Sequence, residues 1–173
     1  MIKYLKNNLL SGYKVSPIQK IGLSLSLTLI FTFIALFIGN IGNLYRPQIL
    51  NSWLIYILPL SLFIFPSFLE ESFFRGILIP NNTKEKGPKT ILVLTLISAT
   101  LFTIWHPLNA LTINLSAKEV FLNPYFLIIV FCLGVICSLS YIYSKSLWAP
   151  IIIHWTTTVI WVIFLGGRNL ILE

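Results

Sequence analysis

The sequence contains very few charged residues and no aspartate. Only 10% of its 173 residues are charged, whereas 57% are hydrophobic, and the mean hydropathy is +0.88. A typical soluble domain carries roughly 25% charged residues, because its surface must be covered by polar groups. This scarcity excludes an ordinary soluble domain. The sequence therefore predicts a protein whose solvent is mostly lipid.

Cysteine is also scarce, and the charge that is present is mostly basic. Cys132 and Cys137 lie five residues apart in one apolar run, a spacing that predicts buried thiols instead of a disulfide. The formal net charge is +7, but the basic residues stand between apolar runs and do not form one continuous stretch. We therefore expect them to orient the chain in a membrane, and we expect no nucleic-acid partner.

Long apolar runs predict an all-α fold, a polytopic transmembrane helical bundle of about five spans. The first run, preceded by several lysines, is longer than the apolar region of a signal peptide, so we interpret it as a retained span. The second contains Pro59 and Pro66 and continues past two glutamates to Ile79. Residues 1–45 are predicted to form a basic segment with the first helix, and residues 46–173 the functional core. The five runs are residues 21–39, 53–69, 91–105, 125–143 and 147–165.

The distribution of basic residues predicts a cytoplasmic N-terminus. With the N-terminus inside, eight lysines fall in inside segments and three basic residues in outside segments, as the positive-inside rule requires. The inside set is Lys3, Lys6, Lys14, Lys20, Lys84, Lys86, Lys89 and Lys145, and the outside set is Arg46, Lys118 and Arg168. A small-residue pair, Gly134 and Ser138, predicts a helix contact, either inside the bundle or between two copies of the chain.

Ionisable side chains within the apolar runs are the candidates for chemistry. Glu70 and Glu71 are adjacent in one run, and the only two histidines, His106 and His154, lie in two others. Each such group costs at least ~2.5–3.5 kcal/mol in a bilayer, so it is rarely retained without a purpose. Their occurrence in three helices predicts one shared polar pocket.

Helical spacing indicates that the two glutamates have different roles. Neighbouring residues on a helix point about 100° apart, so Glu70 and Glu71 face different partners. Arg75 lies four residues after Glu71, the favourable orientation for a helical ion pair. Such a pair would leave Glu70 as the free carboxylate, although a Glu–Arg pair alone could also serve only to lock two helices together. His154 and Thr158 are also four residues apart, so they share a helix face.

Three motifs in order resemble those of the CPBP (Abi) intramembrane proteases, which include the type II CAAX prenyl endopeptidases and bacteriocin-immunity proteins. The motifs are Glu70-Glu71 followed by Arg75, Phe102 followed by His106, and His154 followed by Thr158. The run Ser146-Leu147-Trp148-Ala149-Pro150 resembles the start of the third motif. The resemblance covers roughly residues 50–165 and implies hydrolysis of a peptide bond inside the membrane, in a protein or peptide substrate associated with the lipid.

The resemblance implies that Glu70 activates the attacking water and that His106 and His154 complete the site. Two roles for the histidines stay open. With Glu70 they would be ligands of a divalent metal such as zinc, with Glu71 then acting as the base. Without a metal they would stabilise the oxyanion. Thr158 departs from the family pattern, which usually has Asn or Asp at this position.

This departure keeps a second function open, that of a catalytically inactive relative acting as a membrane scaffold or an immunity-type binding protein. A small proton-relaying transporter is a third interpretation, and the lack of repeated halves counts against it. The sequence does not indicate an oligomeric state.

Overall fold

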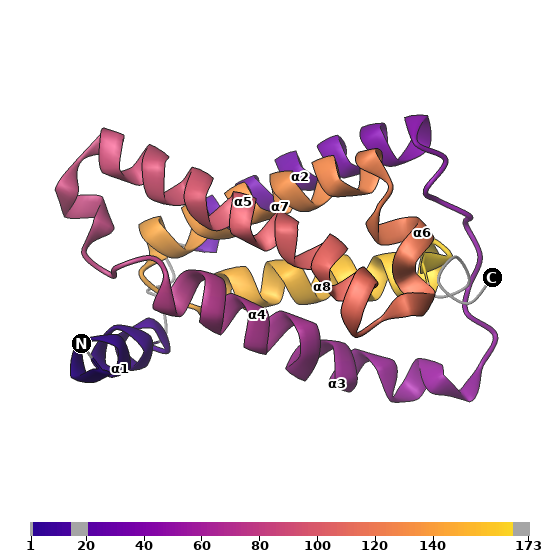
Figure 1. The fold of residues 1–173 in the computed structure, drawn as a ribbon, viewed down its shortest axis with the longest axis horizontal. Helices are drawn as coiled ribbons and strands as arrows, with labels where there is room; N and C mark the ends of the chain where they lie inside the picture. The colour runs from indigo at the N-terminus through magenta and orange to yellow at the C-terminus, as the bar shows by residue number, and fades with distance from the viewer. Residues whose placement is uncertain (1, 15–20, 168–173) are drawn as a thin grey trace.

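The structure is a computed structural model that describes residues 2–14 and 21–167, and these residues form an elongated bundle of helices (Figure 1). Lys20 and Arg168, which the predicted topology counts, lie outside this range. Within it the β-structure consists of an isolated parallel bridge between Gln48 and Leu165. The prediction of an all-α fold is therefore confirmed for the described part of the chain.

Three helices are each long and apolar enough to cross a membrane. They are α2 (Ile21–Ile41), α5 (Pro88–Thr112) and α7 (Pro124–Ser144). A fourth apolar helix, α8 (Trp148–Phe164), has 17 residues. These helices indicate a multi-pass membrane protein. Four shorter helices lie outside these spans and outside the second apolar run: α1 (Ile2–Gly12), η5 (Thr83–Lys86), η6 (Leu115–Ala117) and α6 (Lys118–Phe121).

The second apolar run is a succession of short helices and not one regular span. Phe65 has non-helical backbone angles (φ −136°, ψ 120°). It precedes Pro66, and proline both lacks an N–H group and disfavours the helical conformation of the residue before it. The chain therefore bends just ahead of the two glutamates. The pieces are η2 (Trp53–Tyr56), α3 (Leu58–Leu62), η3 (Phe63–Phe68), α4 (Leu69–Glu71) and η4 (Ser72–Ile77).

The third run is longer than predicted. The sequence indicated 15 residues ending at Trp105, whereas α5 has 25 residues and continues through His106 and Pro107 to Thr112. A proline inside a membrane helix is tolerated when its neighbours satisfy the freed backbone group. In Figure 1, α5 runs obliquely across α8. Its extra length and its tilt decide where His106 lies.

Small residues let α5 and α7 pack closely. A Cβ atom added to Gly134 would lie 3.0 Å from the Cα of Ala99, so a larger residue would push the two helices apart. Ser138 is fully buried and donates to the carbonyl of Gly134 at 2.8 Å. The predicted pair of small residues is therefore an internal contact. Cys132 and Cys137 are free thiols of the same helix, as expected, but only Cys137 is buried and Cys132 is half-buried.

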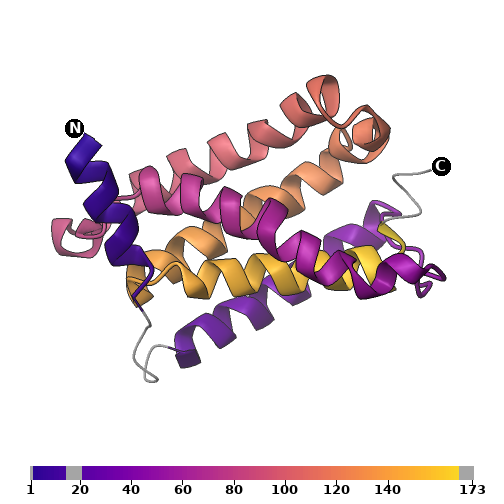
Figure 2. The ribbon, with the colours of Figure 1, turned by 90° about the horizontal axis from the view of Figure 1, so that it is seen from below.

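Helix α1 binds the end of the bundle at which α5 and α8 begin (Figure 2). The Asn8 side-chain amide donates to the carbonyls of Gly76 and Ile79 at 2.7 and 3.1 Å, and the Leu147 N–H donates to the Gly12 carbonyl at 2.6 Å. These bonds satisfy carbonyls that the end of a helix leaves unpaired.

The loops at this end also contact one another. Lys145 forms an exposed ion pair with Glu85, and the hydrogen bond from Lys145 holds the pKa of the Glu85 carboxyl below its ordinary value. The loop before α5 and the turn between α7 and α8 therefore lie side by side with α1.

Candidate functional site

Glu70 and Glu71 lie on α4, directly after the bend at Phe65. Both are buried, with 7% and 0% of their surface exposed. Adjacent positions on a helix point in different directions. The two carboxylates accordingly have different partners, and those partners define different roles.

Glu71 is held by two cationic or polar groups at one oxygen. Arg75 Nη1 donates to Glu71 Oε1 at 3.0 Å, and His154 Nδ1 lies 2.9 Å from the same oxygen. Arg75 Nη2 also donates to the Gly134 carbonyl at 2.9 Å, and its guanidinium carbon lies 4.6 Å from the centre of the Phe102 ring. The structure thus pairs Arg75 with Glu71, and this pair joins α4 to α5, α7 and α8.

Glu70 has one strong hydrogen bond and one free oxygen. Trp105 Nε1 donates to Glu70 Oε1 at 2.9 Å. Glu70 Oε2, like Glu71 Oε2, is buried and has no hydrogen-bond partner among the described residues. Sequence reasoning missed Trp105, although an indole N–H inside an apolar run needs an acceptor and so signals a polar neighbour. Glu70 is therefore oriented by Trp105 and, unlike Glu71, has no cation bonded to it among the described residues.

The two histidines meet at Phe102, which belongs to the second motif. The Phe102 ring lies edge-on to both imidazoles, with centroid distances of 5.0 Å to His106 and 5.5 Å to His154. His106 lies about 27 Å along α5 and His154 about 9 Å along α8, at 1.5 Å per residue. The oblique course of α5 removes this difference in depth. The structure therefore brings both rings to one place.

Each histidine uses its Nδ1 atom on a protein acceptor. His106 Nδ1 lies 3.0 Å from the Phe102 carbonyl, and His154 Nδ1 lies 2.9 Å from Glu71 Oε1. A carbonyl oxygen can only accept, so His106 Nδ1 carries the proton and its Nε2 is an acceptor when the ring is neutral. The Nε2 atom of each ring is the one left for a ligand.

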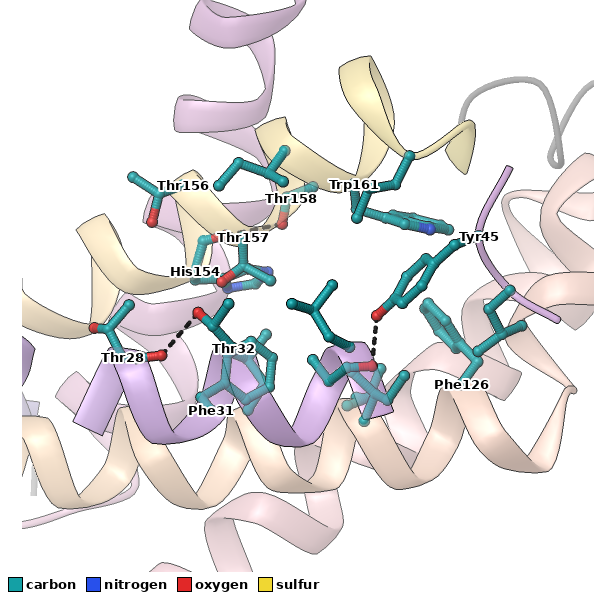
Figure 3. A pocket seen from close by; sticks show the side chains of 18 of the residues that line it. Thr28, Phe31, Thr32, Tyr45, Phe126, His154, Thr156, Thr157, Thr158 and Trp161 are labelled. Atoms are coloured by element: carbon teal, nitrogen blue, oxygen red, sulfur yellow. Dashed lines mark hydrogen bonds between the residues drawn. The ribbon is translucent and has the colours of Figure 1, made fainter. Parts of the chain in front are cut away.

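A cavity of about 180 Å³ lies beside the histidines, between α2, α7 and α8 (Figure 3). His106, His154 and Thr158 line it, and most of the remaining wall is apolar. Glu70 is not among the described residues that line it, but Pro66, one helical turn earlier, is. The cavity is therefore adjacent to the histidines, with the glutamate helix at its edge.

Thr158 does not present a free hydroxyl proton to this cavity. Its Oγ1 donates to the carbonyl of His154 at 2.9 Å, along its own helix. A threonine hydroxyl has one proton and two acceptor lone pairs. In this arrangement Thr158 can only accept a hydrogen bond from a molecule in the cavity.

The predicted metal ligands do not come together as a metal site. Within residues 2–14 and 21–167, no group of three or more His, Cys, Asp or Glu side chains is arranged to hold a metal ion. Trp105 donates to Glu70 Oε1 and Glu71 Oε1 lies at His154 Nδ1, so these atoms are not metal ligands, and the three predicted ligand side chains are not grouped around one point as the ligands of an ion would be. A zinc site normally needs three protein ligands. The arrangement of Glu70, His106 and His154 therefore does not fit zinc, and we assign no step to a metal.

Comparison with known proteins identifies the family. A model of the Rce1-like type II CAAX prenyl endopeptidases matches residues 51–160. The chain belongs to this family. The match contains all three motifs, so the CPBP family predicted from them is confirmed. No curated protein and no solved structure matches the chain. Membership in the Rce1-like family implies an intramembrane protease, and helices α1 and α2 precede the matched segment.

Proposed function

We propose that the chain is an intramembrane endopeptidase that cleaves membrane-associated proteins, with prenylated CAAX-like peptides as the substrate class. Glu70 is the general base. The observation that carries this assignment is the unequal use of the two glutamates. Glu71 Oε1 is shared by Arg75 and His154, whereas Glu70 Oε1 accepts only the Trp105 N–H and Glu70 has no cation bonded to it among the described residues. The Oε2 atom of each glutamate is buried without a partner among the described residues. A base must be able to accept the proton of the attacking water, and Glu70 can do so without giving up an ion pair with a buried arginine.

The two histidines have different roles in this proposal, because their Nδ1 atoms have different partners. His106 donates from Nδ1 to a carbonyl, so its Nε2 accepts a hydrogen bond and can orient the water beside Glu70. His154 Nδ1 donates to the Glu71 carboxylate, and in the doubly protonated ring the Nε2–H donates to the oxyanion that develops on the substrate carbonyl. Arg75 is a positioning residue, because it acts through Glu71.

The distribution of basic residues between the two ends of the bundle supports an orientation in the membrane. One end is that at which α1 contacts the loop before α5 and the turn before α8. Seven described lysines lie in segments at that end: in α1 and just after it, in η5 and the start of α5, and in the turn before α8. Arg46 and Lys118 lie in segments at the opposite end. We therefore assign the α1 end to the cytoplasm. The composite segment 53–77 and α8 complete five crossings with α2, α5 and α7.

The experiment that tests this function is cleavage of a defined peptide. The purified chain is reconstituted in proteoliposomes with a dye-labelled peptide that ends in a farnesylated CAAX sequence. Products are identified by mass spectrometry. We expect one internal peptide bond near the C-terminus to be hydrolysed. Wild-type protein that is folded and reconstituted but leaves both this peptide and its geranylgeranyl form intact would contradict the proposal.

Thr158 supports a second candidate, an inactive relative that binds membrane proteins without cleaving them. Its hydroxyl proton is committed to the His154 carbonyl, so the third motif lacks the side-chain donor that its usual Asn would supply. One oxyanion donor is worth about 10²–10³ in rate. We therefore expect the wild-type chain to cleave more slowly than a chain with Asn at this position.

Thr158→Asn is expected to raise the cleavage rate of the same peptide by about 10-fold or more, because the amide restores a donor beside His154. Thr157→Asn is the matched control. Thr157 also lines the cavity and donates to its own helix at 2.8 Å, but it is not in the motif. Rates are measured under single-turnover conditions. An equal effect of both variants, or a loss of rate in Thr158→Asn alone, would remove Thr158 from the oxyanion site.

A further inference from the structure

Helix α2 forms a wall of the cavity that holds the two histidines. Thr28, Phe31 and Thr32 of α2 line one side, and His154 and Thr158 of α8 line the other (Figure 3). Helix α2 ends at Ile41, ten residues before the segment that matches the Rce1-like family. Family membership therefore leaves this part of the cavity unexplained.

Threonine side chains give both facing walls the same chemistry. On α2, Thr28 and Thr32 donate to the carbonyls of Ser24 and Thr28 at 2.8 and 2.9 Å. On α8, Thr157 and Thr158 donate within their own helix in the same way. Their protons are used, so these hydroxyl groups offer acceptor lone pairs to the cavity. The walls therefore suit a ligand that is largely apolar and carries N–H donors.

An extended peptide is the ligand with that combination. Its apolar side chains fit the remaining wall, and its backbone N–H groups have no partner inside a membrane unless the protein supplies acceptors. A hydrocarbon chain alone would leave the threonine oxygens unpaired. The hydrogen-bonding capacity of the two walls thus favours a peptide backbone lying between α2 and α8.

The cavity reaches the lipid-facing surface between these two helices. Leu36 of α2 and Ile160 of α8 line the cavity and are 43% and 50% exposed. Thr32 lies on the same rim and is exposed. The neighbouring Phe33 is 74% exposed and is not among the cavity-lining residues, so it faces outward from α2. A membrane-embedded substrate could therefore enter sideways from the lipid.

We infer that α2 is part of the substrate-binding site, and that an extended apolar peptide segment enters between α2 and α8 and binds against Thr28, Phe31 and Thr32. This inference rests on the proposed function for the identity of the ligand. Helix α2, which precedes the matched segment, would then determine which substrate side chains are accepted beside the cleaved bond.

The test places one bulky group at each of two adjacent positions of α2. Thr32→Cys and Phe33→Cys are made in a chain carrying Cys132→Ala, and Cys137, which is fully buried, is kept. Each variant is assayed with the farnesylated CAAX peptide before and after labelling with a benzophenone maleimide. We expect labelling at position 32 to slow cleavage by about 10²-fold, the loss that a small displacement of a substrate causes. Labelling at position 33 should change the rate less than about twofold.

Mass spectrometry of the intact protein checks that both positions are labelled to the same extent. Equal rates after labelling at both positions, or equal losses at both, would overturn the inference. Irradiation then gives a readout that does not need cleavage, because the benzophenone attaches to any probe peptide within reach. We expect attachment from position 32 and little from position 33. If the wild type cleaves nothing, the protease proposal fails, but preferential attachment at position 32 still supports α2 as a binding wall. Attachment that is equal at both positions, or absent at both, overturns it.

Discussion

Glu70→Gln is expected to abolish detectable cleavage, with a fall in rate of about 10²–10⁴-fold, the contribution of a general base. The glutamine keeps the shape of the side chain, and its carbonyl oxygen can still accept from Trp105, as Glu70 Oε1 does at 2.9 Å. It cannot take the proton of the attacking water. The rate is measured with the farnesylated peptide in proteoliposomes, and folding is checked by thermal unfolding in detergent.

Glu85→Gln is the matched control, because Glu85 is an exposed carboxylate in an ion pair at the end of the bundle. It should cleave at the wild-type rate. A cellular assay does not require the substrate to be known. Glu70→Gln replaces the wild-type chain, and the phenotype of a deletion is scored. Full rescue by Glu70→Gln would contradict the protease proposal and favour the binding protein without catalytic activity.

Arg75→Ala is expected to lower the free energy of unfolding by about 3–5 kcal/mol, the cost of leaving a buried charge without its partner. Arg75 is fully buried and bonds to Glu71 and to the Gly134 carbonyl. Its loss also removes a cation from the Phe102 ring. The yield of folded protein in detergent and the midpoint of thermal unfolding measure the effect.

Lys84→Ala serves as the surface control, since Lys84 is exposed and its ammonium group lies over the Tyr143 ring. Its effect should stay within about 0.5 kcal/mol. An Arg75→Ala protein that is as stable as the wild type, yet inactive, would move Arg75 from the positioning role into the catalytic group.

The sequence predicted those features that depend on composition and local spacing. The scarcity of charge indicated a membrane bundle, and the four-residue spacing of Glu71 and Arg75 indicated their contact. The order of the three motifs was sufficient to identify the family, which the match over residues 51–160 confirms. Each of these signals is carried by residues close together in the chain or by averages over it.

The features that sequence reasoning missed depend on the paths of helices. The 25-residue length of α5 could not be read from a sequence with Pro107 in it, because a proline usually ends a predicted helix. The hydrogen bond from Trp105 to Glu70 depends on the tilt of α5. The contact that His106 and His154 both make with Phe102 depends on it as well. The place of α2 beside His154 results from packing between segments more than 100 residues apart, which no local pattern records.

One oxygen atom, Glu71 Oε1, receives both the guanidinium that stabilises the fold and the imidazole that we place in catalysis. Substitutions at Arg75 and His154 are therefore coupled thermodynamically, since contacting residues in one network do not contribute independently. Selection at this atom therefore cannot change the stability of the fold without also changing the catalytic site. The same oxygen limits both the evolvability of the site and any attempt to engineer a more stable variant.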